Sequence, residues 1–451
     1  MQDTITFAAT GDSFITRKLP VKTASYKEIA RIINRADFRF TNLEVTLHHN
    51  EGIPGAVSGG TWAMGSPELL SDLKNYGFNT LAWANNHTLD YSIDGLKATE
   101  KYLNESGFVH AGAGQNLAYA SEPRYLETDP GRVALISATS TFHESWVAGE
   151  QRPDMIGRPG INPLRYKTTH QITPENMSTL KQIASTTYLN AAQELSIKEG
   201  FLLRRTDGIF SFGDYLFEES KEEGQTTTPD ERDMERIIRS IKQAKRQARY
   251  IIVSIHAHEM RKGDKELPAQ FLEKFARRCI DEGAHAIIGH GPHVLRGIEI
   301  YKNRPIFYSL GNFIFQNDTV PYLPTDFYEK YQLSHTDNVA DALDKRSKNN
   351  TIGFGTNHKI WESVIPIWTM EKGELSELKL YPVELGYGKK RYERGWPILS
   401  DNQDILQRLA KLSEPYGTQI NLEGNIGIIR LKEHTTAIEK TEYFKNTIKS
   451  L

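Results

Sequence analysis

Histidines are concentrated in one short stretch of this 451-residue sequence. Five of the 14 histidines lie between positions 256 and 293, where even spacing would place about one. Four of the five closely follow the short apolar runs 250–255 and 286–288, which predict buried strands. They are His256, His258, His290 and His293, whereas His285 precedes its run and is interpreted as structural. Because neutral imidazole is the commonest protein ligand for metal ions, this clustering indicates a metal site.

Other predicted strands also end in polar residues, namely Asp12, Glu44, Asn86, His87, Asp90 and Asn312. The carboxyl ends of neighbouring strands meet at one edge of an α/β sheet, so we expect these side chains to converge with the histidines. Imidazoles combined with carboxylates and an amide oxygen suit one or two divalent ions, such as Mn, Zn, Fe or Ca. The predicted metal ligands are Asp12, Glu44, Asn86, His256, His290 and His293.

Taken singly, these motifs have low specificity. Gly11-Asp12 commonly forms a turn, and Asn85-Asn86-His87 commonly forms a loop. The prediction depends on their joint occurrence, since so many buried polar groups without a metal would be costly to satisfy.

The composition and the missing motifs exclude several classes of protein. The single cysteine, Cys279, excludes an intrachain disulfide and a Cys-x-x-Cys zinc site. A net charge of −2 gives no basic excess for nucleic acid. No apolar run is long enough for a membrane span, and no basic-then-apolar leader opens the sequence, so we expect a cytoplasmic protein. Phosphate-binding Gly-rich loops and a Gly-x-Ser-x-Gly elbow are also absent from the sequence.

Short apolar runs alternate with helical periodicity, which predicts an α/β fold. The predicted strands are 4–10, 38–42, 80–84, 133–137, 250–255, 286–288 and 306–310. We expect a core over residues 1–320 with a helical insertion at about 141–247, in which 218–228 has no regular pattern. Residues 321–451 would form a long loop and a C-terminal extension packed on that core. The segment 317–351 is interpreted either as a lid over the substrate or as a solvated surface loop.

Several ordered motifs resemble those of the CapA family, the poly-γ-glutamate capsule synthesis proteins of the calcineurin-like metallophosphoesterase superfamily. The most specific are Gly289-His290-Gly291-Pro292-His293 and Tyr308-Ser309-Leu310-Gly311-Asn312-Phe313. The resemblance implies a four-layer αββα sandwich with one or two metals at the strand ends. It also implies that one metal is bound by Asp12 and His293 and the other by Asn86, His256 and His290, with Glu44 as the bridge between them. In the same pattern, His87 would protonate a leaving group.

The sequence departs from the superfamily pattern at three positions. Phe14 stands where the first motif has a histidine, which removes one imidazole from one metal. Glu44 stands where the pattern has a bridging aspartate, and its side chain is one methylene longer. The run His256-Ala257-His258-Glu259 stands where CapA relatives commonly have His-Trp-Gly-x-Glu, so His258 could be a ligand, a partner of a ligand or a substrate contact.

The sequence favours a metal-dependent enzyme that acts on a peptide or γ-glutamyl-type substrate, or on an anionic polymer. We expect hydrolysis of an amide or a phosphoester by metal-activated water, with His87 and Asp90 as the catalytic pair. The predicted substrate contacts are Arg17, Asn312 and His258. Lys18 could add positive charge to bind an acidic substrate. Alternatively, Arg17 and Lys18 are a solvated pair on the surface. Two other functions remain open: a metal-dependent peptide epimerase, and a non-catalytic component of capsule polymer synthesis or export.

Overall fold

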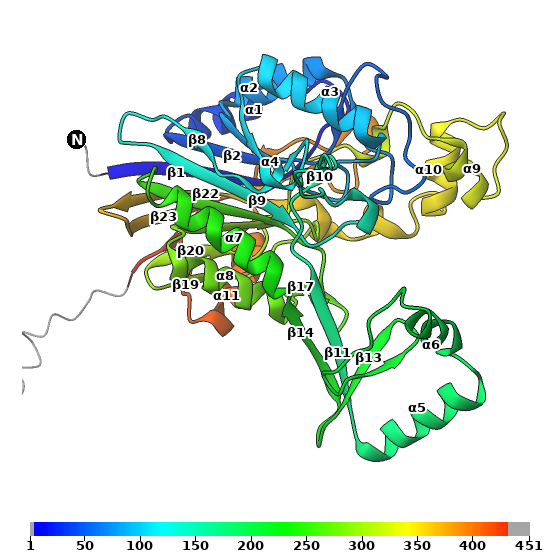
Figure 1. The fold of residues 1–451 in the computed structure, drawn as a ribbon. Helices are drawn as coiled ribbons and strands as arrows, with labels where there is room; N and C mark the ends of the chain where they lie inside the picture. The colour runs from blue at the N-terminus through cyan, green and yellow to red at the C-terminus, as the bar shows by residue number, and fades with distance from the viewer. Residues whose placement is uncertain (1–3, 432–451) are drawn as a thin grey trace, which may run out of the picture.

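The computed structural model describes residues 4–431. Its main body contains two sheets that face each other (Figure 1). The strand order of the larger sheet is β25 (Asn421–Glu423), β26 (Ile426–Ile429), β23 (Glu374–Glu384), β22 (Glu362–Glu371), β1 (Thr4–Phe14), β2 (Phe38–Leu43), β5 (Thr80–Ala82) and β6 (Val109–Ala111), with β21 (Asn312–Phe315) beside β1 and β24 (Ile398–Leu399) beside β23. The strand order of the smaller sheet is β19 (Ile298–Tyr301), β20 (Arg304–Phe307), β18 (Ala286–His290), β15 (Tyr250–His256), β9 (Val133–Thr139) and β8 (Arg124–Leu126).

Parallel pairing brings several strand ends to the same edge of each sheet. In the larger sheet β1, β2 and β5 run parallel, and in the smaller sheet β9, β15 and β18 do so. The register places Asp12 beside Asn42 and places His256 beside His290. The alternation of strands and helices in the sequence therefore builds an α/β core, as predicted.

Apolar side chains fill the space between the sheets. The ring of Phe7 in β1 lies 5.1 Å from that of Trp368 in β22 and 5.6 Å from that of Tyr250 in the facing sheet. All three side chains are fully buried. Burial of a side chain the size of Phe7 stabilises the fold by roughly 1.5–3 kcal/mol. This core fixes the two sheets face to face and so fixes the relative positions of their strand ends.

Helices cover the outer faces of both sheets (Figure 1). Those on the larger sheet are α1 (Ala24–Ile33), α2 (Leu70–Tyr76) and α3 (Ser92–Glu105), and those on the smaller sheet are α7 (Glu231–Ala244) and α8 (Gln270–Glu282). In α8 the buried residues recur every three or four positions, and Gly283 ends the helix with a φ of +121°. Cys279 lies on this buried face. A last helix, α11 (Gln403–Ser413), contributes Ile405, Leu406 and Leu409 to the core between the sheets.

The insertion differs from the predicted helical segment. It is an arm that projects from the body (Figure 1), and its strand order is β12 (Phe210–Phe212), β13 (Tyr215–Glu219), β11 (Tyr166–Ile172) and β14 (Gly224–Pro229). Two helices, α5 (Pro174–Thr186) and α6 (Ala191–Lys198), accompany this sheet, whereas α7 belongs to the core layer. The segment 218–228 lacks apolar alternation because β14 is largely exposed, although its run of β-branched threonines favours a strand.

Residues 318–431 do more than pack on the core. β22 pairs with β1 along the larger sheet, so the C-terminal region completes that sheet. The predicted long loop contains α9 (Thr325–Lys330) and α10 (Val339–Ser347), and Phe327 and Leu343 pack there against Trp62. No helix among residues 4–431 is long and apolar enough to cross a membrane.

Short elements complete the described chain. They are α4 (Leu117–Ser121) and the strand pairs β3 (Thr46–Leu47) with β4 (Met64–Gly65), β7 (Ala113–Gly114) with β10 (Gly160–Ile161), and β16 (Met260–Arg261) with β17 (Asp264–Pro268).

Candidate metal centre

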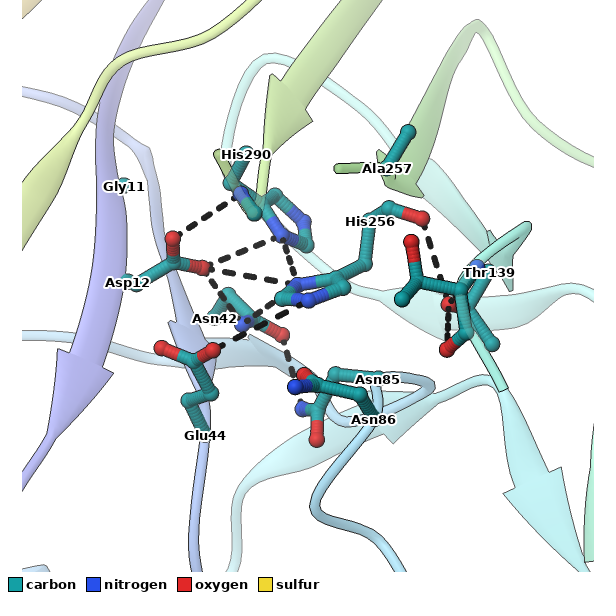
Figure 2. Close-up of polar contacts among 12 residues, drawn as sticks. Gly11, Asp12, Asn42, Glu44, Asn85, Asn86, Thr139, His256, Ala257 and His290 are labelled. Atoms are coloured by element: carbon teal, nitrogen blue, oxygen red, sulfur yellow. Dashed lines mark hydrogen bonds and ion pairs between the residues drawn. The ribbon is translucent and has the colours of Figure 1, made fainter. Parts of the chain in front are cut away.

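Asp12 lies at the centre of the polar cluster, near the end of β1 (Figure 2). Its Oδ1 atom is 3.3 Å from His290 Nδ1 and 3.6 Å from His256 Nδ1. The Asn42 amide donates to Oδ1 at 2.8 Å, and the Gly291 backbone N–H donates to Oδ2 at 2.9 Å. These contacts hold the carboxylate rigidly with one oxygen facing the two imidazoles.

Two imidazoles from neighbouring strands face each other across the same point (Figure 2). The Nδ1 atoms of His256 and His290 are 3.0 Å apart, and Ser254 lies 2.8 Å from Nε2 of His290. Ligands about 2.0–2.1 Å from a tetrahedral ion are about 3.3 Å from one another. The separations among Asp12, His256 and His290 are close to that value, so these three side chains could share one divalent ion.

A second group of donors surrounds Glu44. Its Oε1 atom lies 3.8 Å from His256 Nε2 and 4.0 Å from His293 Nε2. Asn312 accepts a hydrogen bond from His293 Nδ1 at 2.9 Å, because the Asn312 amide group donates to the Ile360 carbonyl. That bond fixes the proton on Nδ1 and leaves Nε2 of His293 free toward Glu44. A second possible metal-binding group thus consists of Asp12, Glu44 and His293. A third consists of Glu44, His256 and His258.

Three buried oxygens in this region have no hydrogen-bond partner among the described residues. They are both carboxylate oxygens of Glu44 and the side-chain oxygen of Asn86. The Asn86 amide group donates to the Gly59 carbonyl at 3.0 Å, which assigns the unpartnered position to its oxygen. Buried polar atoms without partners are rare and costly. Oxygen donors left free beside imidazoles fit a divalent cation.

Burial sets the charge states of the centre. Burial by itself would raise the pKa of Asp12, but hydrogen bonds from His256 and His290 hold that pKa well below its ordinary value. Burial raises the pKa of Glu44 well above the ordinary value, and the charges of Asp12 and Asp90 raise it further. Burial also lowers the pKa of His256 and of His293 to about 4. These imidazoles are therefore neutral near pH 7, which is the form that binds metals.

His87 and Asp90 form a buried pair beside this centre. The Nδ1 atom of His87 lies 2.6 Å from Asp90 Oδ2. Asp90 also accepts hydrogen bonds from the backbone N–H groups of Gly59 at 2.9 Å and Ala63 at 2.7 Å. Since a carboxylate only accepts, Nδ1 of His87 carries the proton and Nε2 is available for chemistry. Asp90 is fully buried, and this contact holds the His87 ring.

A cavity of ≈ 380 Å³ opens beside the donors, and His87, His258 and His293 line part of it. Its other walls come from the Gly59–Thr61 loop and from residues between 346 and 355. The segment 317–351, for which the sequence left two interpretations, thus forms part of the cavity wall. Gly59 lies so close to Asn86 and His87 that a Cβ atom would be 2.4 Å from the Asn86 carbonyl oxygen. A glycine is required there for the loop to cover the site.

The three predicted substrate contacts have different positions in the structure. His258 lines the cavity, with its Nε2 atom 3.2 Å from His256 Nε2. Asn312 is fully buried and holds His293, so it positions a candidate ligand instead of facing a substrate. Arg17 lies outside the cavity lining. Its guanidinium donates to the carbonyls of Arg391, Tyr392 and Arg394 and lies over the Trp396 ring.

Two cationic cavity residues were absent from the sequence-based set, Lys265 and Arg346. Neither residue belongs to a motif, and each follows a stretch with no strand-end pattern. Nothing in the local sequence marks them, because their approach to the histidines depends on the packing of distant segments.

The fold and these donors define an α/β protein with a buried centre of imidazoles and carboxylates at its strand ends. The sequence matches the family described as "Bacterial capsule synthesis protein PGA_cap" over residues 6–317. The chain therefore belongs to this bacterial capsule synthesis protein family, which confirms the resemblance to CapA.

Individual relatives cover much of the chain. The uncharacterized proteins y4sH and y4uA of Sinorhizobium fredii are each 37% identical over 443 residues, which is 95% of this chain and 94% of theirs. The capsule biosynthesis protein CapA of Bacillus anthracis is 25% identical over 313 residues, which is 64% of this chain and 57% of that protein. The similarity to y4sH and y4uA thus extends through the arm and the C-terminal region as well.

Proposed function

We propose that this protein is a metal-dependent hydrolase that acts on a peptide or γ-glutamyl-type substrate. The observation that carries the proposal is the set of unpartnered oxygens of Glu44 and Asn86 among neutral, buried imidazoles. The order of layers, helix, sheet, sheet and helix, with donors at the strand ends, supports a sandwich of the calcineurin-like metallophosphoesterase type. Membership of a capsule synthesis family supports a polymer-related substrate.

In this proposal one divalent ion would be held by Asp12, His256 and His290, and a second by Asp12, Glu44 and His293. Asn86 would supply a further oxygen donor. A bound ion supplies Lewis-acid polarisation of a carbonyl or phosphoryl oxygen and lowers the pKa of water. Asp12 is held in the ionised form by its two imidazole neighbours. The hydrogen bonds of Asn42, Ser254 and Asn312 fix the orientation of three of the donors.

The protein's own acid–base group is His87. Its Nδ1 proton is committed to Asp90, so Nε2 is the atom that can take a proton from the attacking water and then pass it to a leaving amine or alcohol at the cavity. Phe14 packs against the His87 ring at 5.2 Å between centroids and restricts its rotation. The Gly59–Thr61 loop covers the pair and limits the access of bulk water.

The test uses chelator-treated full-length protein reloaded with Mn²⁺ or Zn²⁺. A panel of α- and γ-glutamyl peptides is followed by amine release, and bis-p-nitrophenyl phosphate is followed by absorbance. We expect metal-dependent amine release that His290→Ala abolishes and that the exposed-site control His335→Ala retains.

Other outcomes would replace the proposal. Deuterium uptake from heavy water into an uncleaved peptide would indicate an epimerase. Hydrolysis confined to the phosphodiester would indicate a phosphoesterase. Polymer binding without turnover of any substrate would indicate a non-catalytic component of capsule synthesis.

A further inference from the structure

Part of the cavity wall carries two cationic side chains, Lys265 and Arg346. Neither forms an ion pair with a carboxylate within residues 4–431. The one carboxylate in the lining belongs to Asp318, which forms a close ion pair with Arg394. The Arg394 guanidinium in turn lies 4.4 Å from the Trp361 ring centroid. Asp318 also attracts the Arg346 guanidinium, but together with Arg394 the wall keeps an excess of positive charge for a ligand.

Arg346 is held in position by contacts that leave most of its donors free. It lies in the last turn of α10, where Nη1 donates to Thr61 Oγ1 at 2.6 Å. Its guanidinium carbon is 5.6 Å from the centroid of the Phe327 ring. Thr61 engages one of the five N–H donors of the guanidinium. The side chain is thus oriented before any ligand arrives, with further donors able to bind an oxyanion.

Lys265 is connected to the centre through aromatic rings. Its Nζ atom lies 5.6 Å from the centroid of Phe354, and the Phe354 ring lies 5.5 Å from that of His293. Phe315 packs against the same Phe354 ring at 5.3 Å. Phe14 and Phe315 also line the cavity. An apolar strip therefore separates the cationic wall from the candidate metal ligands.

From this arrangement we infer that Arg346 and Lys265 form an anion subsite. It binds a carboxylate or phosphate group of the substrate, while the apolar stem that joins this group to the reacting bond lies over Phe14, Phe315 and Phe354. The inference rests on the proposed function for the identity of the reacting bond, but not for anion binding itself. Arg346 lies beyond residues 6–317, the range matched by the family, so this part of the subsite is outside the shared family segment.

The subsite also replaces the counter-charge that the sequence assigned to Arg17. The Arg17 guanidinium is already occupied by backbone carbonyls. A cavity of ≈ 380 Å³ is near the lower limit for small-ligand sites. That volume suits a chain end or a small acidic molecule with its charged group at Arg346 and Lys265.

Isothermal titration of chelator-treated full-length protein tests the subsite without metal or turnover. Glutarate is the carboxylate probe and inorganic phosphate is the phosphate probe, each at constant ionic strength. We expect at least one probe to bind, and we expect Arg346→Gln and Lys265→Gln each to weaken it by about tenfold or more. Preference for glutarate would assign the subsite to a carboxylate, and preference for phosphate would assign it to a phosphate.

Matched variants separate charge from folding. Lys345→Gln removes an exposed charge on the same helix and outside the cavity, so it should leave binding unchanged. Arg346→Lys keeps the charge and should retain more binding than Arg346→Gln. Lys265 is exposed and its ammonium group lies over the Phe354 ring, so Lys265→Gln should unfold at the wild-type temperature. If neither probe binds, or if the double variant Arg346→Gln/Lys265→Gln binds as the wild type does, the inference is wrong. Because no metal is present, either result is independent of the hydrolase proposal.

Discussion

Glu44 is the least satisfied group of the centre, since its carboxylate is fully buried and accepts no hydrogen bond from residues 4–431. Its neighbours Asp12 and Asp90 repel a negative charge at this position. A bound cation would reverse the sign of that interaction. The same side chain therefore opposes folding of the metal-free protein when ionised and favours binding of a divalent ion.

Glu44→Gln should separate these two effects. The folded-state pKa of Glu44 is raised, so the stability of the folded protein falls as pH rises and the buried carboxyl group loses its proton. The isosteric amide carries no charge, so the variant does not lose stability in this way. At pH 8 we expect the chelator-treated variant to be about 1 kcal/mol more stable than wild type. We also expect Mn²⁺ to raise its Tm less than it raises that of wild type. Denaturant and thermal unfolding with and without Mn²⁺ measure both effects. The control Glu235→Gln, at an exposed position of α7, should respond to Mn²⁺ as wild type does. If Mn²⁺ stabilises Glu44→Gln as much as it stabilises wild type, Glu44 is not a metal ligand.

Asp90→Asn tests the orientation of His87. Asp90 accepts from one imidazole and two backbone groups, and an amide must turn a donor toward at least one of these donors. We expect turnover of the peptide identified in the substrate panel to fall about 10²- to 10⁴-fold, with unchanged metal content by elemental analysis. An unaffected rate would show that His87 does not need Asp90.

At the scale of elements, the base of the arm is attached to α8 of the body. The ring of Tyr166 in β11 stacks on Phe271 of α8 at 4.4 Å, and Thr227 of β14 accepts a hydrogen bond from the Phe271 N–H group. Beyond these contacts, α5 buries only Met177 and Ala184, and α6 buries no residue. The outer arm therefore contributes little to the core.

Replacement of residues 170–225 by Asn-Gly should preserve the body. The new turn would join Thr169 to Thr226, which are already paired across β11 and β14, and Asn-Gly favours a two-residue hairpin. We expect a Tm within roughly 5 °C of wild type and unchanged Mn²⁺ binding. Extension of the deletion to 166–229 removes Tyr166 and Thr227 and should lower the Tm further. Loss of metal binding in the shorter deletion would assign the arm a part in the centre.

His110 in β6 should make stability depend on pH. Burial, together with repulsion by Arg124, lowers its pKa to about 4. Between pH 6.5 and 4 the unfolded chain therefore takes up a proton that the folded protein does not, so stability falls as pH falls. We expect His110→Gln, which can keep a hydrogen bond to Asn104, to remove up to about 3 kcal/mol of that fall at pH 4. Unfolding titrations at several pH values measure it. The exposed His335→Gln control should follow wild type, and parallel curves for wild type and His110→Gln would contradict the prediction.

For the whole molecule, local sequence patterns predict the sheets and helices of the core better than they predict the residues that line the cavity. Apolar runs such as 250–255 and polar strand ends such as Asp12 are local signals, so the α/β core and the convergence of the donors could be anticipated. The strands of the arm could not, because exposed strands lack apolar alternation. The engagement of Arg17 by residues near 391–394, and the approach of Arg346 to Thr61, depend on packing between distant segments. No pattern of spacing within either segment encodes such contacts.

The central claim is that the strand-end cluster of the two facing sheets binds divalent metal. Anomalous diffraction at the manganese edge, from crystals grown with Mn²⁺, tests it most directly. We predict one or two peaks within coordination distance, about 2.0–2.4 Å, of the donors among Asp12, Glu44, Asn86, His256, His290 and His293. An absence of anomalous density among these residues, in crystals soaked at millimolar Mn²⁺, would contradict the account.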